Sequence, residues 1–224
     1  METDEKILQA IQNTYVLRPP QQKLSTFGST NVYYYMITEL MQEVNIVREG
    51  HVIAARPRIV TPYYLINVEG FSGAARRYVQ MMAEQSPHEP GILYSYKNET
   101  TETNIISQSL PDIVDKINQR IDSQSNPLSA VIKGVEELWD VSLMKFTFEL
   151  TRNSLRQNIN EFYASGRLRS DEQGVPTDAI ENIEELFGIV RRDPSRAPEL
   201  VSELHRWGLW SQYQDRFLRL FRKH

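Results

Sequence analysis

The chain contains no cysteine among its 224 residues. This absence excludes disulfide bonds, iron–sulfur clusters, thiolate zinc sites and cysteine nucleophiles. A chain of this length can bury roughly 70% of its unfolded surface, so it needs no cross-link to fold. Apolar residues make up 40% of the chain and charged residues 24%, which is typical of a globular protein.

Glycine is scarce, with ten residues, and the sequence contains neither a Gly-rich phosphate loop nor a G-x-S-x-G nucleophile motif. Histidine is rarer still, and no two histidines have the close spacing that makes a metal site recognisable. The four histidines are His51, His88, His205 and His224. We therefore expect no metal ion and no cofactor, and the sequence favours a protein without catalytic activity.

Long hydrophobic runs are also missing, and no window approaches the 18 or so apolar residues of a membrane span. The first 17 residues are acidic and then mixed, unlike the basic start and apolar core of a signal peptide. We therefore expect a cytoplasmic protein. The net charge of -4 argues against coating nucleic acid through bulk charge, although a local basic face is still allowed.

Residues 1–124 combine strand and helix patterns. The aromatic and β-branched run Val32–Ile37 predicts a strand. Two β-hairpins are predicted, one turning at residues 48–50, where Gly50 supplies a turn residue, and one turning at 97–100. Helices are expected near residues 3–15, 63–67, 72–84 and 111–121.

Residues 125–224 are expected to be helical. One long helix is predicted from 128 to 165, ending before Gly166, with an apolar and buried middle. Its apolar stripe consists of Val141, Met144, Phe148, Leu155, Ile159 and Phe162. Apolar and polar residues also alternate over Met144–Thr151, so a strand there remains an alternative. The predicted fold is α+β: a small antiparallel sheet with flanking helices, followed by a C-terminal helical bundle.

Tyrosine and arginine are concentrated between residues 32 and 78. Strand alternation places Tyr33 and Tyr35 on one face, and Arg56 and Arg58 share a side if the strand continues through Pro57. Tyr and Arg dominate protein–protein hot spots, and they also stack on bases or neutralise anions. Half-buried tyrosines with arginines paired to carboxylates are the alternative. The candidate binding residues are Tyr33, Tyr35, Arg56, Arg58, Arg76 and Arg77.

The C-terminal segment predicts a basic amphipathic helix. Its apolar stripe should dock on the core, because short helices are stable only when packed. A partner groove, a membrane surface or nucleic-acid phosphates are the other uses of such a helix. The residues that would contact phosphates are Arg216, Arg219, Arg222 and Lys223.

Three hypotheses for function follow. The first is a non-catalytic interaction protein, an adaptor or complex subunit that binds a protein partner through its Tyr/Arg-rich and C-terminal helical surfaces and can self-associate. The second is a nucleic-acid-binding regulator that uses the basic C-terminal helix. The third is an enzyme with a dispersed site in the sheet half, built from His51, Arg56, Arg58, Tyr33 and Tyr35.

Overall fold

The computed structural model describes residues 2–67, 72–85 and 89–221. Helices and strands are both abundant, and the fold is α+β as predicted. The chain forms two compact units, and each unit is built from two separate segments. Unit 1 comprises Met1–Pro57 with Tyr94–Ile159, and unit 2 comprises Arg58–Leu93 with Asn160–His224. Both units therefore take residues from each side of the predicted division at 124.

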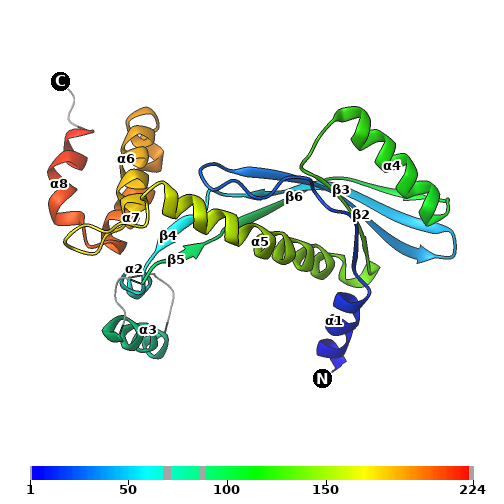
Figure 1. Cartoon of the computed structure of the whole chain (residues 1–224), viewed down its shortest axis with the longest axis horizontal. Helices are drawn as coiled ribbons and strands as arrows, with labels where there is room; N and C mark the ends of the chain where they lie inside the picture. Colours follow the sequence, from blue (N-terminus) through cyan, green and yellow to red (C-terminus); the bar gives the residue numbers. More distant parts are fainter. Residues whose placement is uncertain (1, 68–71, 86–88, 222–224) are drawn as a thin grey trace. The chain divides into compact units, whose positions relative to one another are not determined.

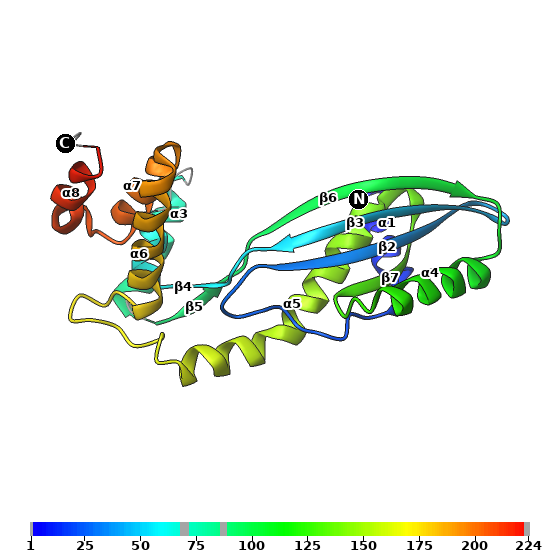
Figure 2. The same ribbon diagram turned by 90° about the horizontal axis from the view of Figure 1, so that it is seen from above.

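Unit 1 is a five-stranded sheet with helices on both faces. Its strands are β1 (Tyr15–Arg18), β2 (Thr30–Met41), β3 (Val44–Ala54), β6 (Tyr96–Ile106) and β7 (Ser129–Gly134). Its helices are α1 (Glu2–Gln12), α4 (Leu110–Gln124), the short η1 (Glu136–Leu138) and most of α5 (Trp139–Ala164). Figure 1 and Figure 2 show α4 on one face of this sheet and α5 on the other.

The strand order is β1-β7-β2-β3-β6. β2 and β7 run parallel, with Tyr34 opposite Ala130, whereas the other neighbours are antiparallel. The sheet is therefore mixed rather than wholly antiparallel. Successive side chains of β2 point to opposite faces, so Tyr34 packs in the α5 core and Tyr35 in the α4 core. The predicted separation of Tyr34 from its neighbours is confirmed.

The first predicted hairpin is wrong in its position. Val44–Ala54 is one continuous strand, and the chain reverses before it, where Glu43 adopts a positive φ of 57°. Gly50 lies inside this strand. Only glycine fits there, because a Cβ would come within 2.5 Å of the Glu99 carbonyl oxygen and 2.6 Å of the Tyr34 hydroxyl. Its glycine reflects close packing and not a turn.

The second predicted hairpin is also wrong, because β6 runs through residues 97–100 without a turn and pairs with β3 along its length. The predicted helix start at 128 is wrong as well, since Ser129–Gly134 forms β7. This strand is buried on both faces, so its apolar run shows no alternation that would reveal a strand. The segment Met144–Thr151 is helical, within α5.

Unit 2 holds a two-stranded sheet and a helical cluster. Its strands are β4 (Arg58–Val60) and β5 (Gly91–Leu93). Its helices are α2 (Pro62–Ile66), α3 (Gly73–Gln85), the end of α5, α6 (Thr177–Arg192), the short η2 (Pro194–Arg196), α7 (Ala197–Arg206) and α8 (Trp210–Arg219). As predicted, Gly166 follows the end of α5 with a positive φ of 73°.

The C-terminal helix docks on the core of unit 2. Phe187 of α6 and Leu204 of α7 are fully buried there, together with Trp207. The apolar side of α8 is half-buried against this cluster through Trp210, Tyr213, Phe217 and Leu220. The apolar stripe of the basic amphipathic helix therefore serves packing within the unit.

Candidate functional site

The two tyrosines predicted as binding residues have different surroundings. Tyr33 is 41% exposed, and its ring lies 5.6 Å from the ring of His51 on the neighbouring strand. Tyr35 is only 8% exposed, because the Arg120 guanidinium of α4 lies 4.7 Å above its ring. Tyr33 is thus open to solvent, and Tyr35 is covered.

His51 belongs to a small charged cluster on β3 and the edge strand β6. Its Nε2 lies 3.1 Å from Glu99, and Glu99 also contacts Lys97 at 2.6 Å. The hydrogen bond from Lys97 is the largest influence on Glu99, and it holds the pKa of this carboxyl below its usual range. These charges offset one another at the surface, so the cluster presents little net charge to a ligand.

The predicted arginines fall into separate parts of the chain. β3 ends at Ala54 and β4 begins at Arg58, so the strand does not continue through Pro57, which was the condition for Arg56 and Arg58 to share a side. Arg56 belongs to unit 1 and Arg58 to unit 2, so they share no strand face. Arg76 and Arg77 lie exposed on α3, where Arg77 contacts Glu84 at 3.1 Å.

The basic residues of the C-terminal helix are partly neutralised. Arg216 binds Glu184 through two hydrogen bonds of 2.6 Å, and its guanidinium lies 4.1 Å from the ring of Phe187. The hydrogen bond from Arg216 lowers the pKa of Glu184. Arg219 is exposed and donates to the Asp215 carbonyl at 3.2 Å, whereas Arg222 and Lys223 lie outside the described residues.

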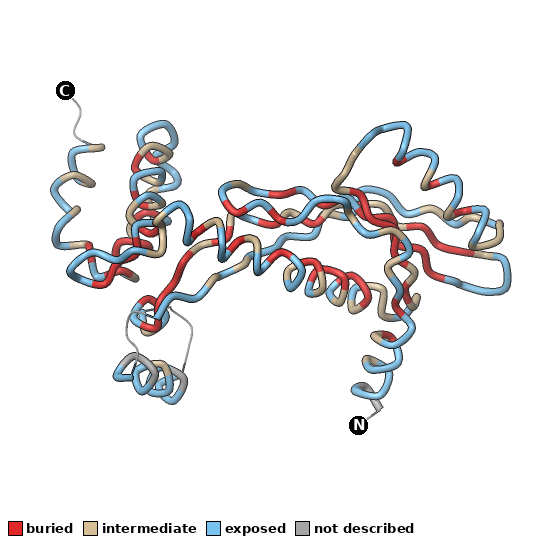
Figure 3. The backbone as a smooth tube through the Cα atoms, viewed as in Figure 1, coloured by how far each residue is buried: buried red, intermediate tan, exposed pale blue. Residues whose placement is uncertain are grey.

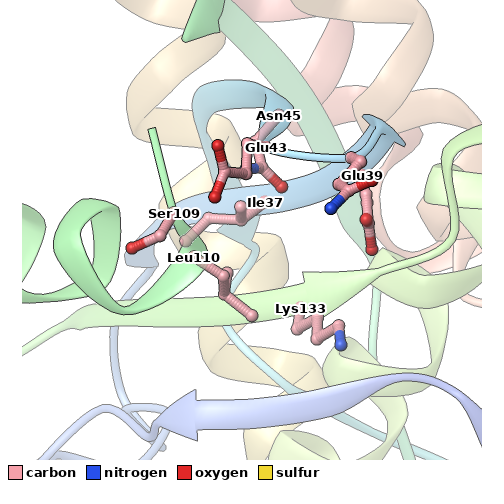
Figure 4. Close-up of a pocket in the computed structure, with 8 residues that line it drawn as sticks. Ile37, Glu39, Glu43, Asn45, Ser109, Leu110 and Lys133 are labelled. Carbon is pink, nitrogen blue, oxygen red and sulfur yellow. The ribbon is translucent and has the colours of Figure 1, made fainter. Parts of the chain in front are cut away.

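A small cavity lies beside the β2–β3 turn (Figure 4). It has a volume of about 220 Å³ and is lined partly by Glu39, Glu43 and Lys133. Its other polar groups already serve the fold, because Asn45 donates to the Gln108 carbonyl at 2.9 Å and Ser109 caps α4. This volume falls below the range of roughly 300–1,000 Å³ that is typical of ligand pockets.

Unit 1 contains a largely buried Arg–Glu pair. Arg48 of β3 binds Glu136 of η1 through two hydrogen bonds of 2.6 and 2.8 Å. Thr38 also donates to Glu136, and the ring of Trp139 lies 5.1 Å from the guanidinium. The hydrogen bonds from Arg48, first, and from Thr38 lower the pKa of Glu136. This pair fastens the start of α5 to the sheet.

Unit 2 contains a second buried carboxylate, Glu203 of α7, whose side chain is 3% exposed. It accepts hydrogen bonds from Arg58, from the Tyr64 hydroxyl at 3.3 Å and from the Trp207 indole at 3.1 Å. Arg206 lies 3.6 Å from the same carboxylate. Both guanidinium groups lie 5.9 Å from the ring of Tyr64, so two arginines meet on one carboxylate and one aromatic ring.

These two arginines line a cavity of about 470 Å³, which we name the α6/α7 cavity. The complete lining consists of Arg58, Asn182, Leu186, Pro198, Glu199, Ser202, Glu203 and Arg206. Within the described parts of the chain, Asn182 Nδ2 is the one buried side-chain polar atom without a hydrogen-bond partner. A buried donor of this kind costs about 1–3 kcal/mol when it stays unpaired.

A third feature is an exposed apolar surface on α5, which we name the α5 stripe. It consists of Met144, Phe148, Leu155 and Ile159, which are 68%, 65%, 38% and 43% exposed. The expected buried middle of this helix is therefore wrong for these four residues. Figure 3 shows buried and exposed residues alternating along α5.

The opposite side of α5 explains this reversal. Leu143, Phe146 and Leu150 pack into the core of unit 1 from that side. Buried polar residues complete it: Ser154 accepts a hydrogen bond from the Leu24 amide at 3.0 Å, and Asn158 donates to the Leu24 carbonyl at 3.0 Å. The side of α5 that faces the core is therefore partly polar, because Ser154 and Asn158 hydrogen-bond to the backbone of Leu24 in the irregular segment before β2.

The sequence pattern does not predict the surroundings of several of these residues. The α5 stripe was assigned to the core, and Glu203, Arg206 and Asn182 were not among the candidate site residues. One signal was available, because Glu203 lies between Leu200 and Trp207 at helical spacing on an apolar face. A carboxylate on an apolar face is buried when the helix packs, so it needs hydrogen-bond donors or cations beside it, and this indicates a polar cluster.

Comparison with protein-family models, curated proteins and solved structures finds no match to this chain. No helix among the described residues is long and apolar enough to cross a membrane. Within 2–67, 72–85 and 89–221, no group of three or more His, Asp or Glu side chains is placed to hold a metal ion. Function must therefore be argued from the surfaces and the cavity described above.

Proposed function

We propose that this chain is a cytoplasmic, non-catalytic interaction protein that binds an amphipathic helix of a protein partner along the α5 stripe. The observation that carries the proposal is the exposure of four large apolar side chains on a helix whose other side is already packed. Contiguous exposed apolar surface of this kind is typical of interaction sites in soluble proteins.

The spacing of the stripe suits a helical partner. Met144, Phe148, Leu155 and Ile159 follow one another at intervals of four, seven and four residues. These intervals place the four residues on one side of the helix, as in the seam of a two-helix packing, and Thr151, whose hydroxyl is hydrogen-bonded to that of Tyr96, lies at its edge. The 15 steps from Met144 to Ile159 span about 22 Å of helix axis, enough for about four turns of a partner helix.

The charges beside the stripe favour an acidic partner. Arg152 follows Phe148 by four residues and Arg156 follows Arg152 by four, so both exposed arginines lie along one edge of the stripe. A partner helix with Asp or Glu at that edge would complement them. Antiparallel pairing with a second copy would instead bring Arg152 beside its own counterpart, which is unfavourable.

The proposal is tested with a synthetic amphipathic helix that carries Leu along one side and Glu at the edge facing the arginines. Its binding to the whole chain is followed by fluorescence anisotropy. Phe148→Ala should weaken binding about tenfold, as loss of a central aromatic contact does. Ile105→Ala is the matched control, because Ile105 of β6 is 68% exposed in the same unit and lies off the stripe.

A charge reversal tests the partner chemistry. The double variant Arg152→Glu with Arg156→Glu should prefer an otherwise identical peptide that carries Lys in place of Glu. Equal losses for Phe148→Ala and Ile105→Ala would contradict the proposal. A dimer in light scattering that Phe148→Glu dissociates would show instead that a second copy covers the stripe.

A further inference from the structure

We infer that another cavity, in unit 1, binds a free α-amino acid that has an apolar side chain. The cavity lies between the segment that follows β1 and the helix α5, and its volume is about 470 Å³. We name it the Pro19/α5 cavity. The inference goes beyond the proposed function, because the lining of this cavity shares no residue with the α5 stripe. It rests on an apolar floor, rigid walls and two opposite charges that do not pair with each other.

The floor of the cavity is part of the core of unit 1. Phe146 and Leu150 of α5 are 2% and 9% exposed and belong to that core, and Val16 of β1 packs against it. Pro19 and Pro20 add apolar surface from the segment after β1. The volume lies within the range of roughly 300–1,000 Å³ that is typical of small-molecule pockets, so the floor suits an apolar side chain.

The walls are held in place by hydrogen bonds of the backbone. The Gln21 amide donates to the Pro127 carbonyl at 2.8 Å, and the Leu24 amide donates to Ser154 Oγ of α5 at 3.0 Å. The rings of the two prolines restrict the backbone between β1 and these bonds. The cavity is therefore formed before a ligand enters, which reduces the entropy that binding must cost.

The negative charge of the lining is Glu149 of α5, whose side chain is 35% exposed. Among the residues that the structure describes, its carboxylate accepts no hydrogen bond and its one ion pair is with Lys145, 3.9 Å away. Lys145 donates instead to the carbonyls of Ile11 and Thr14, at 2.9 Å each. A partly buried carboxylate is stabilised by donors, and the ammonium group of an amino acid supplies three.

The positive charge of the lining is Lys23, which comes from the segment after β1. Within the described chain, its ammonium group forms no ion pair, so it does not neutralise Glu149 across the cavity. An α-amino acid carries the two complementary groups on one carbon atom. Its ammonium group can therefore bind Glu149 and its carboxylate can bind Lys23, while its side chain contacts the apolar floor.

L-Phenylalanine is the first probe, because two analogues of similar shape each remove one of its charges. L-Phenylalaninamide keeps the ammonium group and has a neutral amide in place of the carboxylate, like the first residue of a peptide. 3-Phenylpropanoate keeps the carboxylate and lacks the ammonium group. The three compounds therefore distinguish a free amino acid from the N-terminus of a peptide and from a simple organic acid.

The experiment follows the backbone N–H signals and the side-chain amide of Asn153, another residue of the lining, by NMR while each compound is added to the whole chain. Saturable shifts at Lys23 and Asn153 are expected with L-phenylalanine. Each analogue should bind about tenfold more weakly, the typical effect of losing a hydrogen bond between charged groups.

Two substitutions assign each charge of the ligand to its partner. Glu149→Gln should weaken binding of L-phenylalanine about tenfold and leave binding of 3-phenylpropanoate unchanged. Lys23→Gln should weaken binding of L-phenylalanine by a similar factor and leave binding of L-phenylalaninamide unchanged. Glu102→Gln and Lys116→Gln are the matched controls, because both residues are exposed in unit 1 and lie outside the cavity lining.

The absence of saturable shifts, or losses of the same size in the control variants, would overturn the inference. Binding of 3-phenylpropanoate as tight as that of L-phenylalanine would overturn the role of Glu149, and so would a Glu149→Gln variant that binds L-phenylalanine fully. Equal binding of L-phenylalanine and its amide, with no effect of Lys23→Gln, would overturn the assignment to a free amino acid and indicate a peptide N-terminus.

Discussion

Each unit of this protein buries an Arg–Glu pair against an aromatic ring, yet the two pairs serve different ends. In unit 1, Arg48 and Glu136 meet one to one beside Trp139, and the remaining contact comes from a threonine hydroxyl. In unit 2, Glu203 is shared by Arg58 and Arg206, and both arginines line a cavity. The carboxylate of the first arrangement contacts one guanidinium group, and that of the second contacts two.

The comparison shows that the effect of a buried ion pair depends on how many arginines contact the carboxylate. Burying charges costs several kcal/mol per ion, and a matched pair recovers that cost only with good geometry. The matched pair in unit 1 therefore joins two elements and does no more. In unit 2, the contacts of Arg206 with Tyr64 and Glu203 all use Nη1, so its guanidinium is held less completely than that of Arg48.

The largest expected effect is the loss of Glu203. Glu203→Gln removes the buried carboxylate that Arg58 and Arg206 both contact. Breaking a buried pair typically costs about 3–5 kcal/mol, and we expect roughly 3 kcal/mol because both arginines keep some contact with solvent. Urea unfolding followed by tryptophan fluorescence measures this change. A loss below that of the corresponding substitution in unit 1 would contradict the comparison.

The next effect is the loss of Glu136. Glu136→Gln should lower the free energy of unfolding by about 1–2 kcal/mol, because Arg48 keeps Thr38 and the Trp139 ring as neighbours. The double variant Arg48→Met with Glu136→Leu should recover most of that loss, since a balanced pair can be replaced by apolar residues. If the double variant did not recover the lost free energy of unfolding, the Arg48–Glu136 pair would have a role beyond joining η1 to the sheet.

The pH dependence of stability gives a smaller effect. Hydrogen bonds from Arg48 and Thr38 lower the pKa of Glu136 in the folded state. Its stabilisation is therefore complete above the unfolded pKa of about 4.3 and is lost as the pH falls through the lower folded value. Between about pH 5 and pH 3, the native chain should therefore lose more stability than Glu136→Gln. Urea unfolding of both proteins at each pH tests this prediction. The same change in the free energy of unfolding with pH for both proteins would refute it.

The smallest effect is expected at the surface. Arg216 and Glu184 form a pair that is 41% and 45% exposed. Exposed pairs contribute little, so Arg216→Ala should cost roughly 0.5 kcal/mol, part of it from the lost contact with Phe187. High salt should remove most of the electrostatic share. A loss as large as that of Glu136→Gln would erase the distinction between buried and exposed pairs.

Local patterns predicted much of the secondary structure, because helix caps and apolar periodicity act within a few residues. α2 covers Pro62–Ile66, close to the helix expected near residues 63–67, and Gly166 follows the end of α5 as expected. Turns were predicted less well. Gly50 indicated a turn although it makes room for Tyr34, and the real turn contains Glu43, which carries no turn signal.

The candidate sites were harder to predict, because they depend on contacts between distant residues. Arg58 and Glu203 are 145 residues apart in sequence, so no local pattern joins them. Arg58 was a candidate from its neighbourhood, but its carboxylate partner was not. Along α5, both sides carry large apolar residues, so periodicity alone could not decide whether Phe146 or Phe148 lies in the core.

The interleaving of the two units along the chain has a consequence for biosynthesis. Protein synthesis delivers β1, β2 and β3 first, then the first segment of unit 2, and only afterwards β6 and β7, the second of which completes the parallel pair. Unit 1 must therefore wait, with an open sheet edge, while residues 58–93 emerge. For the same reason, no single cut yields either unit whole. Expression of unit 2 alone requires a new peptide linker from residue 93 to residue 160.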